Sequence, residues 1–212
     1  IKWFIEEFKE ESDVGLVLKV YTKNCSIADR HKTHKKIKDF IQTYDKNRKC
    51  KVYILHGDLT PAQMSALYEN PRVSAFLSIA HGEGYGLPLF EAAAREVPII
   101  TLDWSGQRDF LYAPRKRRHN GKLKRKVQPC FVKVDYKIKK VNKDAVWPGV
   151  IEPTAQWAYA DERSCKSAMR KVRKNLSVYK AQARDLADNI RTNYSFEKKS
   201  QEFIAAIQSY TT

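Results

Sequence analysis

The residues best suited to chemistry lie in one glycine-rich segment, residues 81–88, which reads HGEGYGLP. Glycine at positions 82, 84 and 86 lets the backbone approach a ligand without a Cβ in the way. Pro88 favours a helix that begins directly after these glycines. The free N–H groups and the positive dipole end of such a helix favour phosphate. The segment therefore predicts an anion site built from backbone amides.

Two carboxylates accompany this segment, because Glu83 lies within it and Glu91 follows in the expected first turn of the helix. Carboxylates accept hydrogen bonds from the vicinal hydroxyls of a sugar or a ribose, and they are poor direct partners for phosphate. Amides on the phosphate with carboxylates on the hydroxyls would suit a nucleotide sugar. The spacing also fits a solvated loop glutamate and a surface helix glutamate, so it leaves both interpretations open.

Other common ligand motifs are missing from the sequence. The dinucleotide pattern GxGxxG needs a third glycine where Leu87 stands, and no Lys-Ser/Thr pair completes a P-loop. No Asp-x-Asp motif occurs, which argues against a metal-bound diphosphate. His31 and His34 lack a third metal ligand, and the four cysteines form no Cys-x-x-Cys pair. The sequence therefore predicts reduced thiols, no metal and no cofactor.

The elements that must position the glycine-rich segment alternate between strand and helix. Strands are expected at 15–21, 50–55, 73–80, 97–102 and 130–136, and helices at 3–11, 27–44, 61–68, 88–96, 105–111, 161–174, 178–193 and 195–210. This order is typical of an α/β fold, a Rossmann-like parallel sheet with helices on both faces. Ligands of such sheets bind outside the carboxyl ends of the strands, where the segment is expected to lie. One domain is the economical interpretation of 212 residues.

The positive charge is concentrated in residues 114–126, which read PRKRRHNGKLKRK. Eight of these thirteen residues are basic and none is acidic, so the segment carries half of the net charge of +16. Asn120-Gly121 is a hairpin-turn signal. The segment is either a solvated insertion or a site for a polyanion. The cations of that site would be Arg115, Lys116, Arg117, Arg118, Lys122, Lys124, Arg125 and Lys126.

The glycine-rich segment and its flanks resemble the C-terminal, donor-binding domain of GT-B glycosyltransferases, especially glycosyltransferase family 4. Residues 83–91, which read EGYGLPLFE, are similar to the EX7E motif of that family. Residues 96–101 resemble its Gly-x-Pro-Val-Ile strand, with Glu96 in place of the glycine. Residues 105–109 resemble its Gly-Gly-x-x-Glu turn, with Ser105 in place of the first glycine and an aspartate at the end.

Further similarities lie on both sides of these motifs. Residues 157–161, which read WAYAD, resemble the W-A-x-x-D that opens a late helix of the family. The last expected helix resembles the one that crosses back towards the other GT-B domain. The loop and helix before the glycine-rich segment are similar at His56, Gly57, Asp58, Leu59, Met64, Leu67 and Tyr68. The likeness covers most of residues 13–210 outside the basic insertion.

The resemblance implies a retaining hexosyltransferase. It would move a sugar from a nucleotide-diphosphate sugar to an acceptor that the sequence does not identify, without a metal or a protein nucleophile. Glu83 would contact the donor sugar, and His81 would approach the sugar or the leaving phosphate; a strand-end histidine satisfied within the fold is the open alternative. The donor-binding residues that the likeness implies are Gly84, Tyr85, Gly86, Leu87, Pro88, Glu91 and Leu59.

A GT-B enzyme has two Rossmann-like domains, and residues 1–212 resemble only the donor-binding one. Residues 114–126 would be an insertion in it, and the helix at 195–210 would pack towards an N-terminal domain. In the family, an arginine and a lysine that bind the diphosphate precede the first helix, inside which this sequence starts. We therefore expect that domain and those cations to lie outside the chain, and the chain alone to be inactive or nearly so.

Two other classes of function stay open. A nucleotide-sugar epimerase or phosphorylase could use the same scaffold, although no motif marks the cofactor lysine of a phosphorylase. A module that binds nucleic acid or an anionic membrane surface could be built around residues 115–126. No apolar run approaches the ~18 residues of a transmembrane segment, and no signal-peptide pattern occurs. We expect a cytoplasmic protein, with peripheral attachment to a membrane left open.

Overall fold

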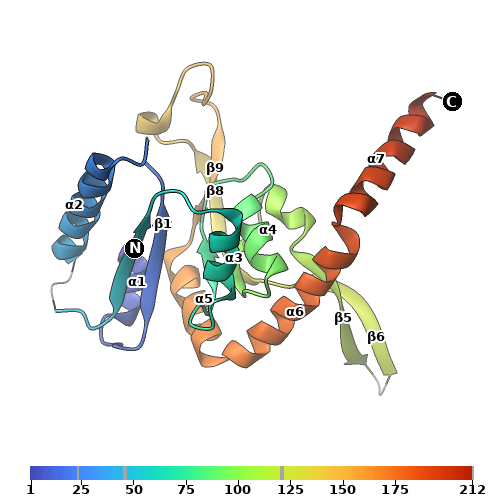
Figure 1. Ribbon diagram of the computed structural model, residues 1–212, viewed down its shortest axis with the longest axis horizontal. Coiled ribbons are helices and arrows are strands. Elements are labelled where there is room, and N and C mark those ends of the chain that lie inside the picture. The colour runs from blue at the N-terminus through green and yellow to red at the C-terminus, as the bar shows by residue number, and fades with distance from the viewer. Residues whose placement is uncertain (23, 45–46, 120–121, 212) are drawn as a thin grey trace. The chain divides into compact units, whose positions relative to one another are not determined.

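The structure, a computed structural model, describes residues 1–22, 24–44, 47–119 and 122–211 (Figure 1). The chain forms two compact units, Ile1–Met64 and Ser65–Thr212. Both units contain parallel strands joined through helices. The predicted α/β class, with a Rossmann-like parallel arrangement, is therefore confirmed.

The first unit is built on two parallel strands. β1 and β2 pair from Gly15 opposite Lys51 to Val20 opposite His56. The predicted helix over residues 27–44 is confirmed residue for residue. The elements of the unit are α1 (Lys2–Phe8), β1 (Gly15–Val20), α2 (Ile27–Tyr44), β2 (Lys51–His56) and the start of α3 (Pro61–Glu69).

α3 begins at the predicted N-cap. The backbone N–H of Gln63 donates to Thr60 Oγ1 at 3.2 Å, and the Gln63 side chain accepts from the Thr60 N–H at 2.9 Å. This reciprocal pair is a capping box, which satisfies two amides that the helix itself leaves without partners. Pro61 follows at the first helical position, where its missing N–H costs nothing.

The second unit is centred on a three-stranded parallel sheet in the order β3-β4-β7. All four residues of β4 are buried, as expected for a central strand that is covered on both faces. α4 and α5 pack on the sheet, and α6 packs on α4. These elements are β3 (Phe76–Ser78), β4 (Ile99–Leu102), β7 (Val132–Val134), α4 (Leu87–Ala94), α5 (Glu162–Lys174) and α6 (Leu176–Asn193).

In the second unit, α4, α5 and α6 bury one face each. In α5 the buried residues are Cys165, Ala168, Met169 and Val172, which recur at the three- and four-residue steps of an amphipathic helix. Burial raises the pKa of the Cys165 thiol to about 11. This thiol is therefore protonated and unreactive at neutral pH.

Two antiparallel ribbons complete the second unit. They are β5 (Tyr112–His119) with β6 (Lys122–Pro129), and β8 (Tyr136–Lys140) with β9 (Gln156–Ala160). The first ribbon contains the basic segment, so the predicted hairpin is confirmed. Its predicted turn residues, Asn120-Gly121, lie outside the described residues.

Three sequence predictions are wrong in type or extent. The helix expected at 105–111 is only a short 3₁₀ turn, η1 (Gly106–Asp109), because the chain leaves it to enter β5. The strand expected at 130–136 ends early at β7, and β8 starts a separate ribbon. The strand expected at 73–80 is confined to β3. The helix expected at 161–174 is confirmed as α5, whose N-cap Asp161 accepts from the Ser164 N–H at 2.8 Å, and residues 157–160 before it lie in β9, a strand that was not predicted.

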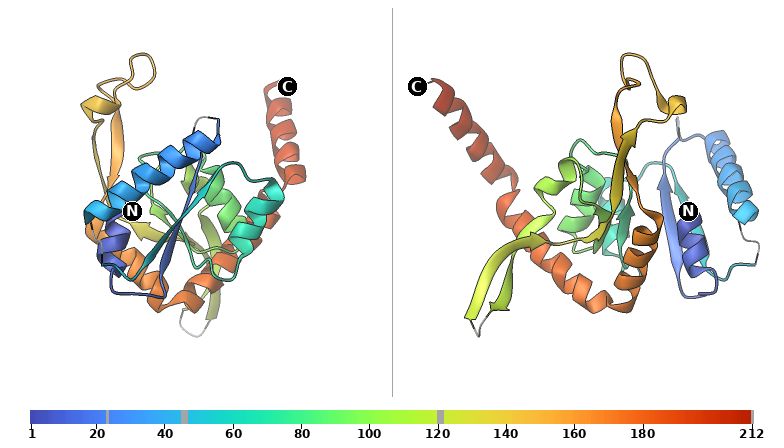
Figure 2. Two further views of the ribbon diagram at one scale, coloured as in Figure 1. Left: turned by 60° about the vertical axis from the view of Figure 1, so that its left-hand side comes forward. Right: turned by 180° about the vertical axis from the view of Figure 1, so that it is seen from behind.

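The last helix, α7 (Phe196–Thr211), extends away from the rest of the second unit (Figures 1 and 2). It begins as predicted, because Ser195 Oγ accepts from the Lys198 N–H at 3.3 Å. No residue in 196–210 is buried. Its exposed large apolar side chains are Phe196, Phe203, Ile204, Ile207 and Tyr210. Within the described residues, no helix has both the length and the apolar composition needed to cross a membrane.

Candidate functional site

The glycine-rich segment joins β3 to α4, as the sequence predicts. Gly86 is the N-cap of α4 with φ 86° and ψ 49°, a left-handed conformation that favours glycine. A Cβ there would also lie 3.1 Å from the Leu89 side chain and 3.2 Å from that of Gln107. The amides at the start of α4 therefore follow a turn that only glycine forms without strain.

A second loop, which follows β4, holds this segment in place. The Glu83 N–H donates to Ser105 Oγ at 3.1 Å, and the same hydroxyl donates to the Glu83 carbonyl at 2.7 Å. The Gly106 N–H donates to that carbonyl as well, at 3.1 Å. A Cβ on Gly106 would stand 1.9 Å from the Gly84 carbonyl oxygen. The loops that follow two neighbouring strands are thus interlocked at the carboxyl edge of the sheet.

His81 is held by β9 rather than left free in the loop. Its Nδ1 lies 2.8 Å from the Ala158 carbonyl oxygen, and the Ala158 N–H donates to the His81 carbonyl at 3.2 Å. The imidazole stacks on Trp157, with 4.8 Å between ring centroids and 10° between planes, and contacts Tyr159 at 4.6 Å. Because a carbonyl can only accept, Nδ1 carries the proton, and Nε2 of the neutral ring is an acceptor.

Sequence reasoning did not find these partners of His81. It placed Trp157 and Tyr159 ahead of the helix expected at 161–174 and assigned them to no strand, so their pairing beside His81 was not foreseen. Their alternation with the small residues Ala158 and Ala160 is the signal that could have placed them on one side of a strand. One ring nitrogen of His81 is thus satisfied within the fold, and a role of His81 towards a ligand stays a prediction.

The two candidate carboxylates lie on different parts of the site. Glu83 is half-buried in the loop, whereas Glu91 is exposed in the second turn of α4 and not in the first, because the helix starts at Leu87. Burial raises the pKa of Tyr68 of α3, and the negative charge of Glu91 adds to that rise. Among the described residues, no hydrogen bond or ion pair joins the Glu83 and Glu91 side chains.

Tyr85 holds the glycine-rich loop in place through contacts of its aromatic ring. Its ring packs against Phe90 at 5.7 Å and Phe110 at 5.3 Å, measured between centroids. Burial raises the pKa of the Tyr85 hydroxyl. By contrast, Leu87 is 62% exposed and Pro88 is exposed, so these two residues form an open apolar edge at the start of α4.

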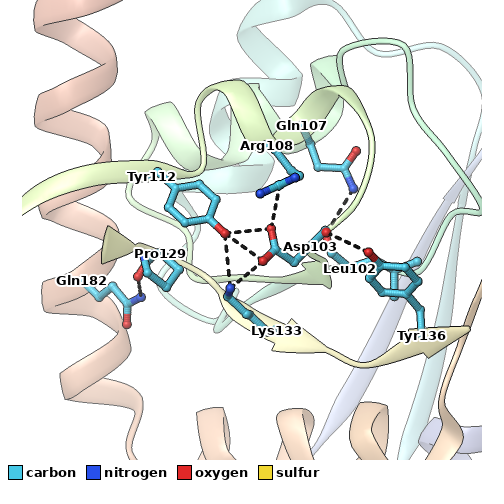
Figure 3. Close-up of polar contacts among 9 residues, drawn as sticks. All are labelled: Leu102, Asp103, Gln107, Arg108, Tyr112, Pro129, Lys133, Tyr136 and Gln182. Atoms are coloured by element: carbon cyan, nitrogen blue, oxygen red, sulfur yellow. Dashed lines mark hydrogen bonds and ion pairs between the residues drawn. The ribbon is translucent and has the colours of Figure 1, made fainter. Parts of the chain in front are cut away.

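Figure 3 shows a polar cluster around Asp103, which follows β4 at the same edge of the sheet. Its carboxylate accepts from Tyr112 Oη at 2.8 Å and Lys133 Nζ at 2.5 Å, and lies 3.0 Å from Arg108 Nε. Burial acts to raise the pKa of Asp103, but the hydrogen bonds and the positive charges outweigh it and hold the pKa below its ordinary value. Sequence reasoning missed this cluster, which ties β4, β5 and β7 together.

The candidate residue Leu59 belongs to the first unit. It is half-buried in the loop after β2. Gly57 of that loop has φ 109°, and its carbonyl accepts from Lys19 Nζ at 2.5 Å. His56 Nε2 lies 2.9 Å from Thr22 Oγ1, so the loop is held to the end of β1.

Two pockets among the described residues contain none of the candidate donor residues. One, in the first unit, is lined by Ile27, Arg30, His31, His34 and Lys35 of α2. A pocket of about 160 Å³ in the second unit is lined by residues such as Val73 and Val97, at the amino ends of β3 and β4, and contains none of the candidate donor residues. Ligands of parallel sheets bind at the opposite, carboxyl ends. In the part of the chain that the structure describes, no group of three or more His, Cys, Asp or Glu residues could hold a metal ion.

Comparison with known proteins identifies the family. A family model described as "Glycosyl transferases group 1" matches residues 4–114, just over half of the chain. The matched span runs from α1 through the interlocked loops and ends where the basic segment begins. No curated protein matches the chain. The chain therefore belongs to the glycosyl transferases group 1 family, within the GT-B superfamily.

Proposed function

We propose that the chain is the donor-binding domain of a retaining glycosyltransferase of the family 4 type, which transfers a hexose from a nucleotide-diphosphate sugar. The observation that carries this proposal is the loop before α4, whose Glu83 backbone is held by Ser105 and Gly106. A loop that is fixed before the ligand arrives loses little conformational entropy on binding. The EX7E resemblance of residues 83–91 supplies the ligand class.

The diphosphate would bind at the amino end of α4. The backbone amides of Gly84, Tyr85 and Gly86 would contact its phosphate oxygens, with Leu87 and Pro88 beside them. When the bond between sugar and diphosphate breaks, negative charge develops on the leaving diphosphate, and the helix end stabilises that charge. The leaving diphosphate takes the proton of the acceptor hydroxyl, so the reaction requires no protein nucleophile and no metal.

The side chains around these amides would bind the sugar and the ribose. Nε2 of His81 would accept a hydrogen bond from a sugar hydroxyl, because Nδ1 is committed to Ala158. Glu83 would accept from other hydroxyls of the sugar, and Glu91, farther along α4, would accept from the ribose. Backbone near Leu59 would contact the base.

An N-terminal domain would complete the enzyme. We propose that it supplies the acceptor site and the diphosphate-binding cations, and that α7 packs towards it. The exposed apolar side chains along α7, which include Phe203 and Ile207, support this role because a helix that stays in water does not need them. The chain by itself would then bind donor but show little or no turnover.

Replacing Glu91 with alanine is expected to weaken donor binding by about 1–3 kcal/mol, the usual effect of losing a charged hydrogen-bond acceptor. A thermal-shift panel of UDP-, GDP- and ADP-sugars first identifies the donor, and calorimetry then compares the variant with the wild-type chain. Glu91 is exposed, so its replacement should leave the melting temperature unchanged.

Glu10→Ala is the matched control for this measurement. Glu10 lies in the first unit and forms only an exposed ion pair with Lys49, so its removal should change neither stability nor affinity appreciably. Donor affinity that is equal in the Glu91→Ala and Glu10→Ala variants would contradict the assigned role. Product analysis with labelled donor and the complete enzyme separates transfer from epimerisation and phosphorolysis.

A further inference from the structure

The ribbon formed by residues 115–119 of β5 and 122–126 of β6, here called the basic ribbon, is anchored firmly at its base. The Gln182 side chain of α6 donates to the Pro129 carbonyl at 2.9 Å (Figure 3), and Arg115 Nε lies 3.0 Å from Asp185 Oδ2 of the same helix. Ala113, at the root of β5, is fully buried. From this base the ribbon extends away from α6 and the sheet (Figures 1 and 2).

The pairing register sets like charges against one another. Arg115 lies opposite Lys126, Lys116 opposite Arg125, and Arg117 opposite Lys124, and no acidic residue occurs in 114–126. Like charges directly opposite each other destabilise an antiparallel pair. In water, repulsion between these cations therefore weakens the pairing of β5 with β6. A partner with regularly spaced negative charges would neutralise the cations and remove that repulsion.

Cationic positions occur on both faces of the basic ribbon. Alternation along paired strands puts the basic positions 115, 117, 122, 124 and 126 on one face and the basic positions 116, 118 and 125 on the other. A flat anionic membrane would meet only one of these faces. The major groove of a nucleic-acid duplex admits a two-stranded ribbon and has a phosphate backbone on each side. The segment contains no Phe, Tyr or Trp on which unpaired bases could stack.

We propose that the basic ribbon binds the phosphate backbones of double-stranded nucleic acid, without preference for sequence. The contacts are charge-assisted and release condensed counterions, so the affinity falls steeply as salt is added. Since the base of the ribbon is fixed to α6, a bound duplex is held by the second unit itself. This binding is independent of the donor site and of the transfer reaction.

The test is fluorescence anisotropy of a labelled duplex of random sequence with the full chain, over about 50–200 mM salt. The variant Lys122→Gln/Lys124→Gln/Lys126→Gln is compared with Lys32→Gln/Lys36→Gln/Lys38→Gln, which removes the same charge from exposed positions of α2. The ribbon variant should lose about tenfold in affinity at 0.1 M salt, and its log–log salt slope should be shallower by about 2–3. The α2 variant should stay close to the wild-type chain.

A single substitution distinguishes this role from a structural one. Lys124→Glu places an acidic residue opposite Arg117, so it should raise the melting temperature of the unbound chain, by about 2 °C, while it weakens duplex binding. Equal losses in the ribbon and α2 variants would overturn the proposal. So would tighter binding of single strands than of duplex, or ribbon-dependent binding to phosphatidylserine vesicles with none to duplex.

Discussion

At the scale of single residues, Glu96 and Ser105 adopt left-handed backbone conformations although neither is glycine. Their φ angles are 61° and 67°, and both stand where the resembling family usually has glycine. Such a conformation costs a non-glycine residue about 1–2 kcal/mol. Each is compensated by its side chain: Ser105 holds Glu83, and Glu96 pairs with Arg184 at 3.5 Å and Arg191 at 3.4 Å.

The Glu96 position yields a prediction about stability. Glu96→Gly relieves the left-handed strain and loses only exposed ion pairs, whereas Glu96→Ala loses the same pairs and keeps the strain. The glycine variant should therefore be more stable than the alanine variant by about 1 kcal/mol. Urea unfolding followed by circular dichroism measures the difference. An alanine variant as stable as the glycine variant would show that the backbone at this position is not strained.

The residues of the site could be predicted from sequence only in part. Residue types and spacing located the glycines and both glutamates, because a glycine-rich turn before a helix has a local signature. The partners of His81 could not be found this way, since Trp157 and Ala158 come from a strand more than seventy residues away. Glu91 was predicted in the first turn of the helix but lies in the second, because α4 begins at Leu87 rather than at Pro88.

At the scale of elements, the Asp103 cluster ties three strands into one edge. Asp103 follows β4, Tyr112 begins β5 and Lys133 lies in β7. The lowered pKa of Asp103 means that the folded chain holds this carboxylate ionised at a pH where the unfolded chain has begun to protonate it. Its stabilising effect is therefore complete above the unfolded pKa of about 3.9 and is lost as the pH falls through the lower, folded pKa.

Asp103→Asn is expected to lower stability at pH 7, by about 1–3 kcal/mol, because charge-assisted hydrogen bonds from Lys133 and Tyr112 are weakened. It should also flatten the fall in stability below about pH 4. Urea unfolding at several pH values measures both effects. The control is Asp39→Asn, which removes only an exposed ion pair with Lys35. If the free energy of unfolding of Asp103→Asn and of the wild-type chain fell equally steeply at acid pH, the cluster would not contribute to acid stability.

The elements themselves were predictable where a local pattern and burial agree. α2 has a capping box between Ser26 and Asp29 at its start and helical periodicity, and β4 is a short run of buried residues. β8 and β9 were not predicted, because their stability comes from pairing with each other across the loop between them. The helix expected at 105–111 failed because tertiary contacts of Ser105 and Gly106 with the glycine-rich loop override its helical pattern.

At the scale of the whole molecule, the family match and the charge distribution divide the chain at nearly the same residue. The match ends at residue 114, and the basic segment, with half of the net charge, starts there. The matched part contains the interlocked loops on which the donor proposal rests. The basic ribbon is anchored on α6, which lies outside the matched part, and is chemically separate from the interlocked loops. Glycosyl transfer and polyanion binding can therefore be tested independently of each other.

The most direct measurement of the central claim is a calorimetric titration of a nucleotide-diphosphate sugar into the wild-type chain and into Gly84→Ala. Gly84 has no positive φ, and a Cβ there would meet nothing within 4 Å, so the unbound fold does not need glycine at this position. A methyl group at a backbone that contacts phosphate should instead obstruct the ligand. The account predicts saturable binding by the wild-type chain and about a tenfold loss in Gly84→Ala, with an unchanged melting temperature. Equal affinity in both chains, or binding of no UDP-, GDP- or ADP-sugar by the wild-type chain, would contradict it.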